Sequence, residues 1–391
     1  MVATGSEPRL YPRIYTAPGQ SFFLFGPRGV GKSTWAAQQF PNAPRIDLLD
    51  EALYQSYLID PDIFAGELRA LADHSWVVVD EIQRLPSLLN QVHRFIEEKR
   101  HRFVLLGSSA RKLKTSGTNL LAGRALRRTM YPLVPEELRE DFSLEAVLQH
   151  GSLPVILQAH SKKEALRAYV ELYLKEEIKA EAIVRNLSGF ARFLPIAALF
   201  HGQVVNVAGL ARDAGVARTT VAGYIDILED TLLAFRLPAF EGRLRVRERR
   251  HPKLYWVDPG IVRAFKKHSG MLAAEEKGAL LEGWVATLLR TYGELQEVFD
   301  ELYYWAPAES RQTEVDFLLQ RGRQYLAIEV KSNPRISPEA LSGLKAISDL
   351  KGVTRRILVY PGKREMKTTE GIEVWPVERL LRALAANKLW P

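Results

Sequence analysis

The sequence predicts a multidomain α/β protein, and three observations lead to that prediction. At 391 residues the chain exceeds the roughly 100–200 residues of a single domain, so we expect two to four domains. Over the first ~135 residues, apolar runs of strand length alternate with stretches of helix length, which is typical of a parallel sheet covered by helices. Helical periodicity then takes over, and a helix followed by two strands marks a second α/β region near the C-terminus.

These elements divide the chain into four regions. The strands expected in the first region are Phe22–Phe25, Arg45–Leu48, Trp76–Val79 and Phe103–Leu106. The second region has helical spacing, as in Lys163–Ala182, and we interpret it as an α-helical lid. The third contains two helices and then short strands, and the fourth begins with a helix at Ala279–Tyr292. The predicted boundaries are 1–135, 136–200, 201–270 and 271–391.

Composition excludes several classes of protein. Hydrophobic residues make up 47% of the chain and charged residues 26%, close to soluble globular averages, so collagen-like and largely disordered proteins are excluded. The absence of cysteine excludes disulfides, thiol catalysis and cysteine-held zinc or iron–sulfur sites. No apolar run approaches the ~18 residues of a membrane span, and the N-terminus has no apolar signal core. We therefore expect a cytoplasmic protein with no membrane partner.

The charge balance favours phosphate as a partner. The formal net charge is +8, and 36 arginines outnumber 18 lysines. Arginine suits planar, bidentate contacts to phosphate. The eight histidines are scattered without metal-site spacing, so we expect a hard cation on carboxylates and phosphates, with Mg²⁺ as the default.

Residues 26–33 form a phosphate-binding loop. They fit the pattern GxxxxGK[ST] at every position, follow a predicted strand and open a predicted helix. Backbone N–H groups can point at a β-phosphate, Lys32 can reach the β- and γ-oxygens, and the Ser33 hydroxyl can bind Mg²⁺. The alternative, a glycine-rich turn that matches by chance, lacks this strand and helix. The predicted nucleotide-binding residues here are Gly26, Pro27, Arg28, Gly29, Val30, Gly31, Lys32, Ser33 and Thr34.

Two carboxylates follow the Val-rich strand Trp76–Val79. A buried parallel strand has this continuous apolar pattern, and ligands bind at the carboxyl ends of such strands. We expect Asp80 to hold Mg²⁺ through water and to contribute to nucleotide binding, and Glu81 to polarise the attacking water. The alternative is a solvated acidic turn.

The next strand ends in small polar residues where a γ-phosphate sensor would lie, and we assign that role to Ser108. Serines here are also ordinary turn formers. Arg124 is our candidate for an arginine finger, a residue that stabilises charge on a transferring phosphate. Other arginines compete for the role or lie on a solvated basic face: Arg111, Arg127 and Arg128.

Residues 206–230 have the spacing of a helix-turn-helix, with the turn at Gly215. The second helix starts at Arg218 but ends in three acids, which disfavours base readout. Downstream, Glu241–Lys267 holds nine basic and three acidic residues, and its alternating arginines would share one face of a strand. We expect sequence-tolerant contacts to the DNA backbone, the alternatives being protein docking and a solvated arginine strand. The predicted DNA-binding residues are Arg218, Arg243, Arg245, Arg247 and Arg249.

A third group of charged residues lies on a predicted hairpin, with strands at 314–319 and 325–331. Strand periodicity puts Glu329 and Lys331 on one face, and Asp316 lies on the neighbouring strand. In such an arrangement two carboxylates hold Mg²⁺ or Mn²⁺, and the lysine orients or activates water for phosphodiester attack. Glu282 in the preceding helix is a candidate further ligand. Surface charges on a hairpin, or an inactive relic that still binds DNA, are the alternatives.

Taken in order, these motifs resemble a family of prokaryotic AAA-type ATPases with a C-terminal restriction-endonuclease-like domain. Leu120–Arg124 and Lys253–Gly260 also fit that order, and the resemblance covers nearly the whole chain. It implies an ASCE-type P-loop sheet, a winged helix and a PD-(D/E)xK nuclease fold. Val315 stands where the nuclease motif has proline, a variation that does not decide activity. The resemblance implies that the functional residues of the family correspond in this sequence to Lys32, Ser33, Asp80, Glu81, Asp316, Glu329 and Lys331.

Two functions are compatible with these features. The first is a Mg²⁺-dependent ATPase that acts on branched or damaged DNA as a motor or remodeller, with a C-terminal domain that grips or cleaves DNA. We expect such a protein to form a homo-oligomer, with a hexameric ring as one arrangement. The second is a nucleotide-dependent switch whose winged helix docks a protein partner and whose nuclease fold is inactive. ATP hydrolysis measured with and without DNA separates the two.

Overall fold

A computed structural model describes residues 9–109, 111, 121–180, 187–242, 250–307 and 313–391, without the side chains of 172–180. The chain forms two compact units. The first contains residues 1–133, 153–158 and 227–233, and the second contains 134–152, 159–226 and 234–391. The four-region division remains a prediction. Four of the predicted DNA-binding residues lie outside the described residues: Arg243, Arg245, Arg247 and Arg249.

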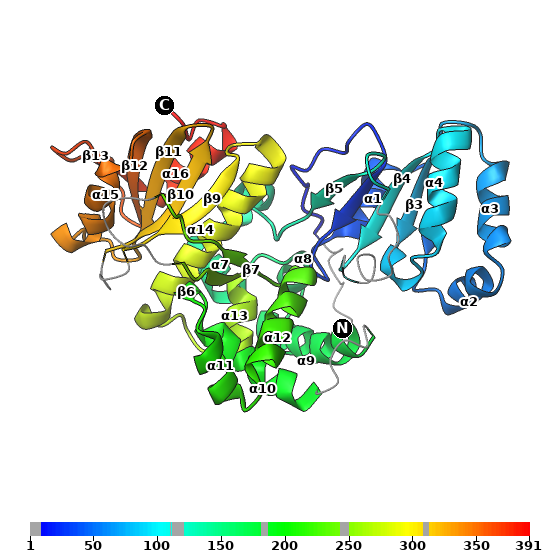
Figure 1. Ribbon diagram of the computed structural model, residues 1–391, viewed down its shortest axis with the longest axis horizontal. Helices are drawn as coiled ribbons and strands as arrows, with labels where there is room; N and C mark the ends of the chain where they lie inside the picture. The colour runs from blue at the N-terminus through cyan, green and yellow to red at the C-terminus, as the bar shows by residue number, and fades with distance from the viewer. Residues whose placement is uncertain (1–8, 110, 112–120, 181–186, 243–249, 308–312) are drawn as a thin grey trace, which may run out of the picture. The chain divides into compact units, whose positions relative to one another are not determined.

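The first unit is built on a five-stranded parallel sheet (Figure 1). Its strands are β1 (Phe22–Phe25), β2 (Arg45–Asp47), β3 (Trp76–Asp80), β4 (Arg102–Gly107) and β5 (Leu126–Thr129). The strand order is β2-β3-β4-β1-β5, so β4 lies between the strands that precede the glycine-rich loop and the paired acids. The parallel sheet predicted for the first region is confirmed. The sequence analysis missed β5, whose two central residues are arginines.

Helices cover both faces of this sheet. They are α1 (Lys32–Gln39), α2 (Glu51–Ile59), α3 (Pro61–Ala70), α4 (Leu88–Lys99) and the short α8 (Pro154–Leu157). On one face Trp35 of α1 packs edge-on against Phe22, with ring centroids 6.1 Å apart. On the other, Phe64 of α3 and Val92 of α4 join the core formed by the strands. Because both faces are buried, the three central strands β1, β3 and β4 are apolar at consecutive positions.

The second unit begins with a helical part. Its helices are α6 (Pro135–Leu138), α7 (Leu144–His150), α9 (Lys162–Ala180), α10 (Leu187–Leu199), α11 (Val207–Ala214), α12 (Arg218–Asp230) and α13 (Pro259–Phe265). The helices predicted around the turn at Gly215 are therefore present as α11 and α12, and Gly215 has the left-handed φ of 63° typical of a helix end. The last residues of α12, from Ile227, are grouped with the first unit.

A small antiparallel sheet is formed by strands on either side of the helix pair in the sequence. Its strands are β6 (Gln203–Val204), β7 (Ala234–Leu237) and β8 (Lys253–Trp256), in the order β6-β8-β7. The predicted arginine strand falls between β7 and β8 in the sequence, at residues 243–249, which lie outside the described residues. Lys253 and Tyr255 on β8 are both buried, which matters for the site described below.

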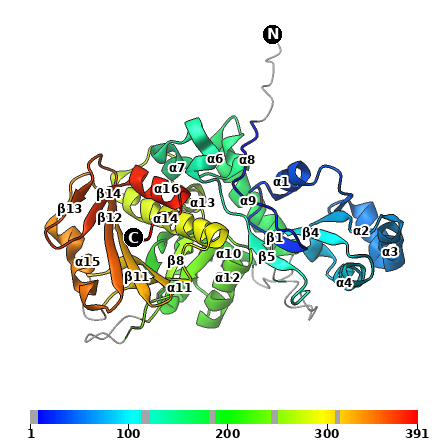
Figure 2. The ribbon, with the colours of Figure 1, turned by 90° about the horizontal axis from the view of Figure 1, so that it is seen from above.

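The C-terminal part is a six-stranded mixed sheet in the order β13-β14-β12-β11-β10-β9. Its elements are α14 (Ala274–Gln296), β9 (Glu301–Trp305), β10 (Val315–Arg321), β11 (Gln324–Val330), α15 (Ser342–Ala346), β12 (Val353–Tyr360), β13 (Met366–Lys367), β14 (Glu373–Pro376) and α16 (Val377–Ala385). The predicted hairpin is present as β10 and β11, with Phe317 opposite Ile328. Helices α14 and α16 lie side by side (Figure 2), and Leu344 of α15 packs into the core of the sheet.

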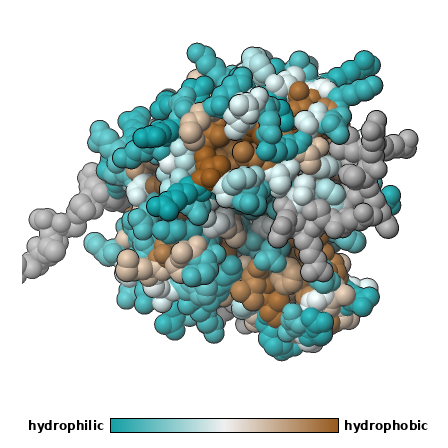
Figure 3. Space-filling model, turned by 90° about the vertical axis from the view of Figure 1, so that its left-hand side faces the viewer, coloured by the Kyte–Doolittle hydropathy of each residue, from teal (hydrophilic) through white to brown (hydrophobic). Residues whose placement is uncertain are grey.

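Hydrophilic residues cover most of the face shown in Figure 3, and hydrophobic residues are gathered in patches between them. Within the described residues, no helix combines the length and the hydropathy that crossing a membrane requires.

Candidate functional site

The first candidate site lies at one edge of the parallel sheet. Phe25, the last residue of β1, is paired with Gly107 at the end of β4, and Val79 of β3 is paired with Leu105. Asp80 therefore ends β3 level with the end of β4, on the edge where the glycine-rich loop leaves β1. This is the edge at which open parallel sheets bind ligands.

The carbonyl groups of the glycine-rich loop are bonded within the protein. The Val155 N–H donates to Gly29 O (3.3 Å), and the Arg13 guanidinium donates to Val30 O (2.9 Å) and to Tyr131 O (2.7 Å). The Val30 N–H donates to Pro27 O (3.3 Å). Because these carbonyl groups accept hydrogen bonds from the protein, the opposite side of the loop is left to present backbone N–H groups to an anion at the start of α1.

Two glycines have the backbone that this curl requires. The φ angles of Gly29 and Gly31 are 74° and 95°, in the left-handed region that side chains disfavour. A Cβ at Gly29 would also lie 2.4 Å from the Val155 side chain. The segment around Val155 was not predicted to contact the loop, because it follows the loop by more than 120 residues in the sequence.

Lys32 is buried and its ammonium is folded onto the loop. It donates to Gly26 O (2.7 Å) and Pro27 O (3.3 Å), while the neighbouring Ser33 and Thr34 are exposed. A charged donor beside loop N–H groups and an exposed hydroxyl at the helix start fits a triphosphate with its Mg²⁺. Among the residues predicted to bind nucleotide, Arg28 is also exposed.

The paired acids have different surroundings. The Asp80 carboxylate is buried and accepts from the Glu81 N–H (3.0 Å), with the Arg45 guanidinium 3.9 Å away. Glu81 has a φ of 55°, which is a strained backbone conformation for this residue type. The chain therefore leaves the extended conformation of β3 at Glu81. The Gln83 side chain donates to Glu81 and to Ser108 Oγ (3.0 Å). Gln83, which the sequence analysis missed, thus joins the predicted base to the predicted sensor.

The structure places the arginine-finger candidates in four different environments. Arg124 pairs with Glu97 of α4 (2.6 Å), and Arg111 pairs with Asp230 at the end of α12 (3.1 Å). Arg127 lies over the Phe25 ring, and Arg128 donates to the Arg127 carbonyl (3.4 Å). The recorded contacts of Arg124 are with Glu97 and Ala122, so its assignment as a finger remains a prediction.

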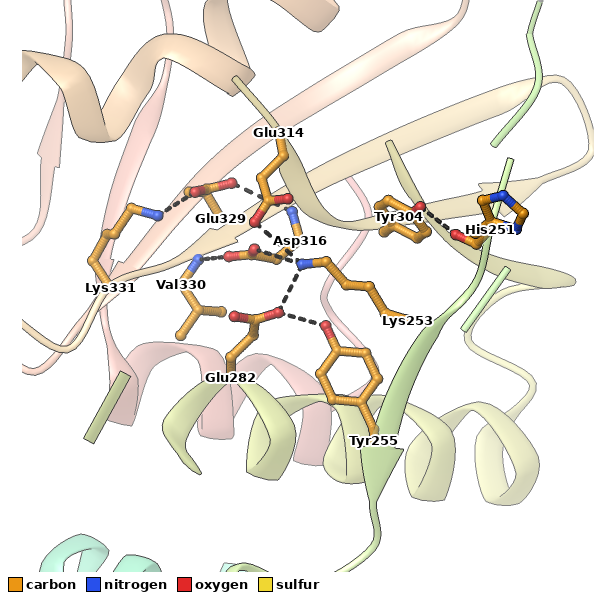
Figure 4. A network of polar contacts seen from close by, with 10 residues as sticks. All are labelled: His251, Lys253, Tyr255, Glu282, Tyr304, Glu314, Asp316, Glu329, Val330 and Lys331. Atoms are coloured by element: carbon orange, nitrogen blue, oxygen red, sulfur yellow. Dashed lines mark hydrogen bonds and ion pairs between the residues drawn. The ribbon is translucent and has the colours of Figure 1, made fainter. Parts of the chain in front are cut away.

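A second candidate site joins β8, α14 and the hairpin of the second unit (Figure 4). The ammonium of Lys253, whose side chain is 2% exposed, lies 2.9 Å from Glu282, 3.2 Å from Glu314 and 3.5 Å from Asp316. The Tyr255 hydroxyl donates to the same Glu282 oxygen. Lys253 therefore lies among the carboxylates where the sequence analysis expected a metal ion.

The remaining predicted members of this site are also present. The Val330 N–H donates to Asp316 Oδ2 (2.8 Å), the Asp316 N–H donates to Glu329 Oε2 (3.3 Å), and Lys331 pairs with Glu329. The structure thus brings together Asp316, Glu329, Lys331 and Glu282 as predicted, and adds Lys253, Tyr255 and Glu314. Lys253 had been noted only as part of the resemblance.

Burial controls ionisation in this site. Burial, and then the charge of Asp316, raises the pKa of Glu282 to about 7 and that of Glu329 well above its ordinary value. Burial lowers the pKa of Lys253, but the neighbouring carboxylates more than offset this and hold it well above the ordinary value. Within the described residues, no group of three acids or histidines is arranged to hold a metal ion. As they lie, these carboxylates fit an ammonium rather than a divalent cation.

Three protein families match successive parts of the chain. Residues 19–139 match an AAA domain, residues 141–271 a domain of unknown function (DUF8612), and residues 277–380 a domain of unknown function (DUF4143). The first match covers the phosphate-binding loop, the paired acids and the parallel sheet. The N-terminal region is thus an AAA-type P-loop domain within a multidomain α/β protein.

Similar proteins extend over most of the chain. Uncharacterized proteins of Mycobacterium tuberculosis and Mycobacterium bovis are each 26% identical over 389 residues, which cover 97% of this chain and 85% of theirs. Among solved structures, Aeropyrum pernix ORC1 in complex with DNA is 13% identical, with 63% of this chain and 86% of that chain covered and a TM-score of 0.26. Replication initiator DnaA bound to AMPPCP and single-stranded DNA is 16% identical, with coverages of 54% and 82% and a TM-score of 0.27. These scores do not establish a shared overall fold.

Proposed function

We propose that the protein is a Mg²⁺-dependent ATPase that acts on DNA. The observation that carries the proposal is the loop at 26–33, whose carbonyls bond to the protein and which leads into α1, where Lys32 and Ser33 are the first two residues. Bound Mg²⁺ would neutralise charge on the β- and γ-phosphates. Ser33 and Asp80 are the residues suited to hold it, and the AAA-domain match to residues 19–139 supports the assignment.

Glu81 is the proposed base. Its side chain is linked through Gln83 to Ser108, so the base and the sensor of the γ-phosphate form one hydrogen-bonded group. In this proposal Ser108 bonds the γ-phosphate and Gln83 orients Glu81 toward the attacking water. Lys32 would leave its loop carbonyls and contact the phosphates.

DNA is the proposed partner of the helix pair and the small sheet, which we interpret as a winged helix. Two of the three acids that argued against DNA contact from α12 have internal partners: Asp226 pairs with Arg236 (3.0 Å) and Asp230 with Arg111 (3.1 Å). Arg218 at the start of α12 is exposed. The exposed basic start of this helix, together with the arginines that the sequence places at 243, 245, 247 and 249, supports contact with a phosphate backbone.

Reversing Arg245 and Arg247 to Glu should lower affinity for duplexes of unrelated sequence by similar factors, because backbone contacts carry no base information. The slope of affinity against salt should also flatten. Fluorescence anisotropy at two salt concentrations measures both effects. The control is Arg69→Glu, which changes an exposed arginine on α3. Unchanged affinity at both salt concentrations would instead assign these arginines to protein docking.

Asp230→Asn should weaken the response of the ATPase to DNA. Asp230 ends α12 and its partner Arg111 follows the strand tip that carries Ser108, so the pair connects the helix end to the nucleotide edge. We expect the ratio of rates with and without DNA to fall about two- to tenfold, as for other coupling residues. The matched control is Asp226→Asn on the same helix, which should keep the ratio. Equal ratios in both variants would refute this coupling.

Lys253 favours a second function for the C-terminal part. We propose that the Lys253 ammonium occupies the place of a metal ion among the carboxylates of this nuclease-like domain. The domain then grips DNA or has a structural role, instead of cutting DNA. The wild type should leave linear and forked duplexes intact with Mg²⁺ or Mn²⁺ in a gel assay. Cleavage that Lys331→Ala abolishes while ATP hydrolysis persists would contradict this proposal and assign Asp316, Glu329 and Lys331 to a nuclease site.

A further inference from the structure

A cavity of about 650 Å³ lies in the helical part of the second unit, away from the residues assigned above. Helices α7, α9, α10 and α13 and the residues after α13 supply its lining. Small-molecule sites in proteins typically measure about 300–1,000 Å³. The cavity is therefore large enough for an organic ligand.

The walls of the cavity are mainly apolar. Leu166 and Val170 are one helical turn apart on α9, so both face the cavity, and Pro195 of α10 and Phe265 of α13 complete the apolar surface. Burial of an apolar ligand body against these side chains would be favourable.

The rim of the cavity carries positive charge. Lys163 and Lys267 are exposed, come from different elements, and have no ion-pair partner within the described residues. The other charged lining residues are neutralised. Arg167 pairs with Glu171 (2.9 Å), and the buried Arg263 pairs with Glu276 (3.1 Å).

Tight contacts fix the walls. Gly151, which follows α7, has a φ of 77°, and a Cβ there would lie 1.8 Å from the Asp258 carboxylate that caps α13. A Cβ at Gly260 would lie 2.2 Å from the His150 carbonyl. Because α7 and α13 cannot approach more closely, the cavity does not close by sliding of these helices.

We propose that this cavity binds an amphipathic organic anion, with an apolar body against the α9, α10 and α13 side chains and an acidic group between Lys163 and Lys267. Burial lowers the pKa of His150, as do the charges of Lys162 and Arg263, so this lining residue is neutral at pH 7 and the two lysines supply the positive charge. A carboxylate or a phosphate monoester has the required chemistry.

The test is a fluorescence titration of the full chain with 8-anilinonaphthalene-1-sulfonate, an aromatic anion. The Lys163→Glu, Lys267→Glu double variant should bind this probe at least about tenfold more weakly, because two favourable charges become repulsive. Val170→Trp should reduce binding by filling the cavity. The control is Lys351→Glu, at an exposed lysine outside the lining, which should bind as the wild type does. Circular dichroism establishes that each variant is folded, and Lys163→Gln with Lys267→Gln replaces any charge-reversed variant that is not.

Competition defines the ligand class. Decanoate should displace the probe, whereas decan-1-ol and inorganic phosphate at equal concentration should displace much less. The proposal is overturned if the wild type does not bind the probe, or if the lysine variants and Val170→Trp bind it like the wild type. Displacement by phosphate as effective as by decanoate would indicate a simple anion site, and equal displacement by decan-1-ol would indicate an uncharged apolar site.

Discussion

Replacing Glu81 by glutamine is expected to abolish ATP turnover while leaving nucleotide binding intact. The amide keeps the size and the hydrogen-bonding reach of the side chain but cannot polarise the attacking water, so the loss appears in the transition state. Removal of a general base typically costs about 10²–10⁴-fold in rate. Phosphate release measures turnover, and titration with a fluorescent ATP analogue measures binding.

Lys32→Ala is the informative comparison for this prediction. The ammonium contacts phosphates in the ground state as well as in the transition state, so both binding and turnover should weaken. Lys99→Ala, at a partly buried lysine of α4 that pairs with Asp73 (3.2 Å), is a suitable control that should retain both properties. If Glu81→Gln hydrolyses ATP at the wild-type rate, the assignment of the base is wrong.

Replacing Lys253 by methionine is expected to be the most destabilising of these substitutions. It removes the ammonium from among Glu282, Glu314 and Asp316, and leaves the buried Asp316 and its two partly buried neighbours without compensation. Breaking a buried ion pair in this way typically costs about 3–5 kcal/mol. Denaturant unfolding of the full chain at pH 8 measures the loss.

The loss of stability caused by Lys253→Met should depend on pH. The pKa of Glu282 is raised to about 7 in the folded protein, above its ordinary value of 4.5. Protonation of Glu282 therefore adds to the free energy of unfolding in full below pH 4.5, and this contribution is lost as the pH rises through 7. Lys253→Met should therefore cost less at pH 5 than at pH 8. Adding Glu282→Gln should restore part of the loss at pH 8.

Lys345→Met is the control for this experiment. Lys345 forms an ion pair with Glu370 in which both side chains are about half exposed, and such a pair contributes less than about 1 kcal/mol. If Lys253→Met unfolds at the same denaturant concentration as the wild type at pH 8, the ammonium does not hold this site together.

The proposed nucleotide-binding edge of the parallel sheet could be predicted because its determinants are local in sequence. A glycine-rich loop between strand and helix, and acids at the end of a Val-rich strand, specify both elements and chemistry within a few residues. The same holds for the hairpin that carries Asp316 and Glu329. In each case the strand period and the sheet edge place the side chains.

The missed residues reach their sites through tertiary structure. Lys253 lies 63 positions before Asp316 and on another sheet, so strand periodicity could not place it among the carboxylates. Val155 contacts Gly29 from a turn-length helix with no motif of its own. Gln83 follows Glu81 closely, but its bond to Ser108 depends on the pairing of β3 with β4. A lysine in an apolar strand such as β8 is a sequence signal from which a buried charge could have been predicted.

Steady-state ATP hydrolysis by the full chain, measured without DNA and with linear, forked and four-way duplexes, tests the central claim most directly. The account predicts Mg²⁺-dependent hydrolysis that rises when DNA is added and is lost in Glu81→Gln. Hydrolysis that no form of DNA changes would contradict a DNA-acting ATPase and support the switch. Absence of hydrolysis under every condition would contradict the proposal that the protein is an ATPase.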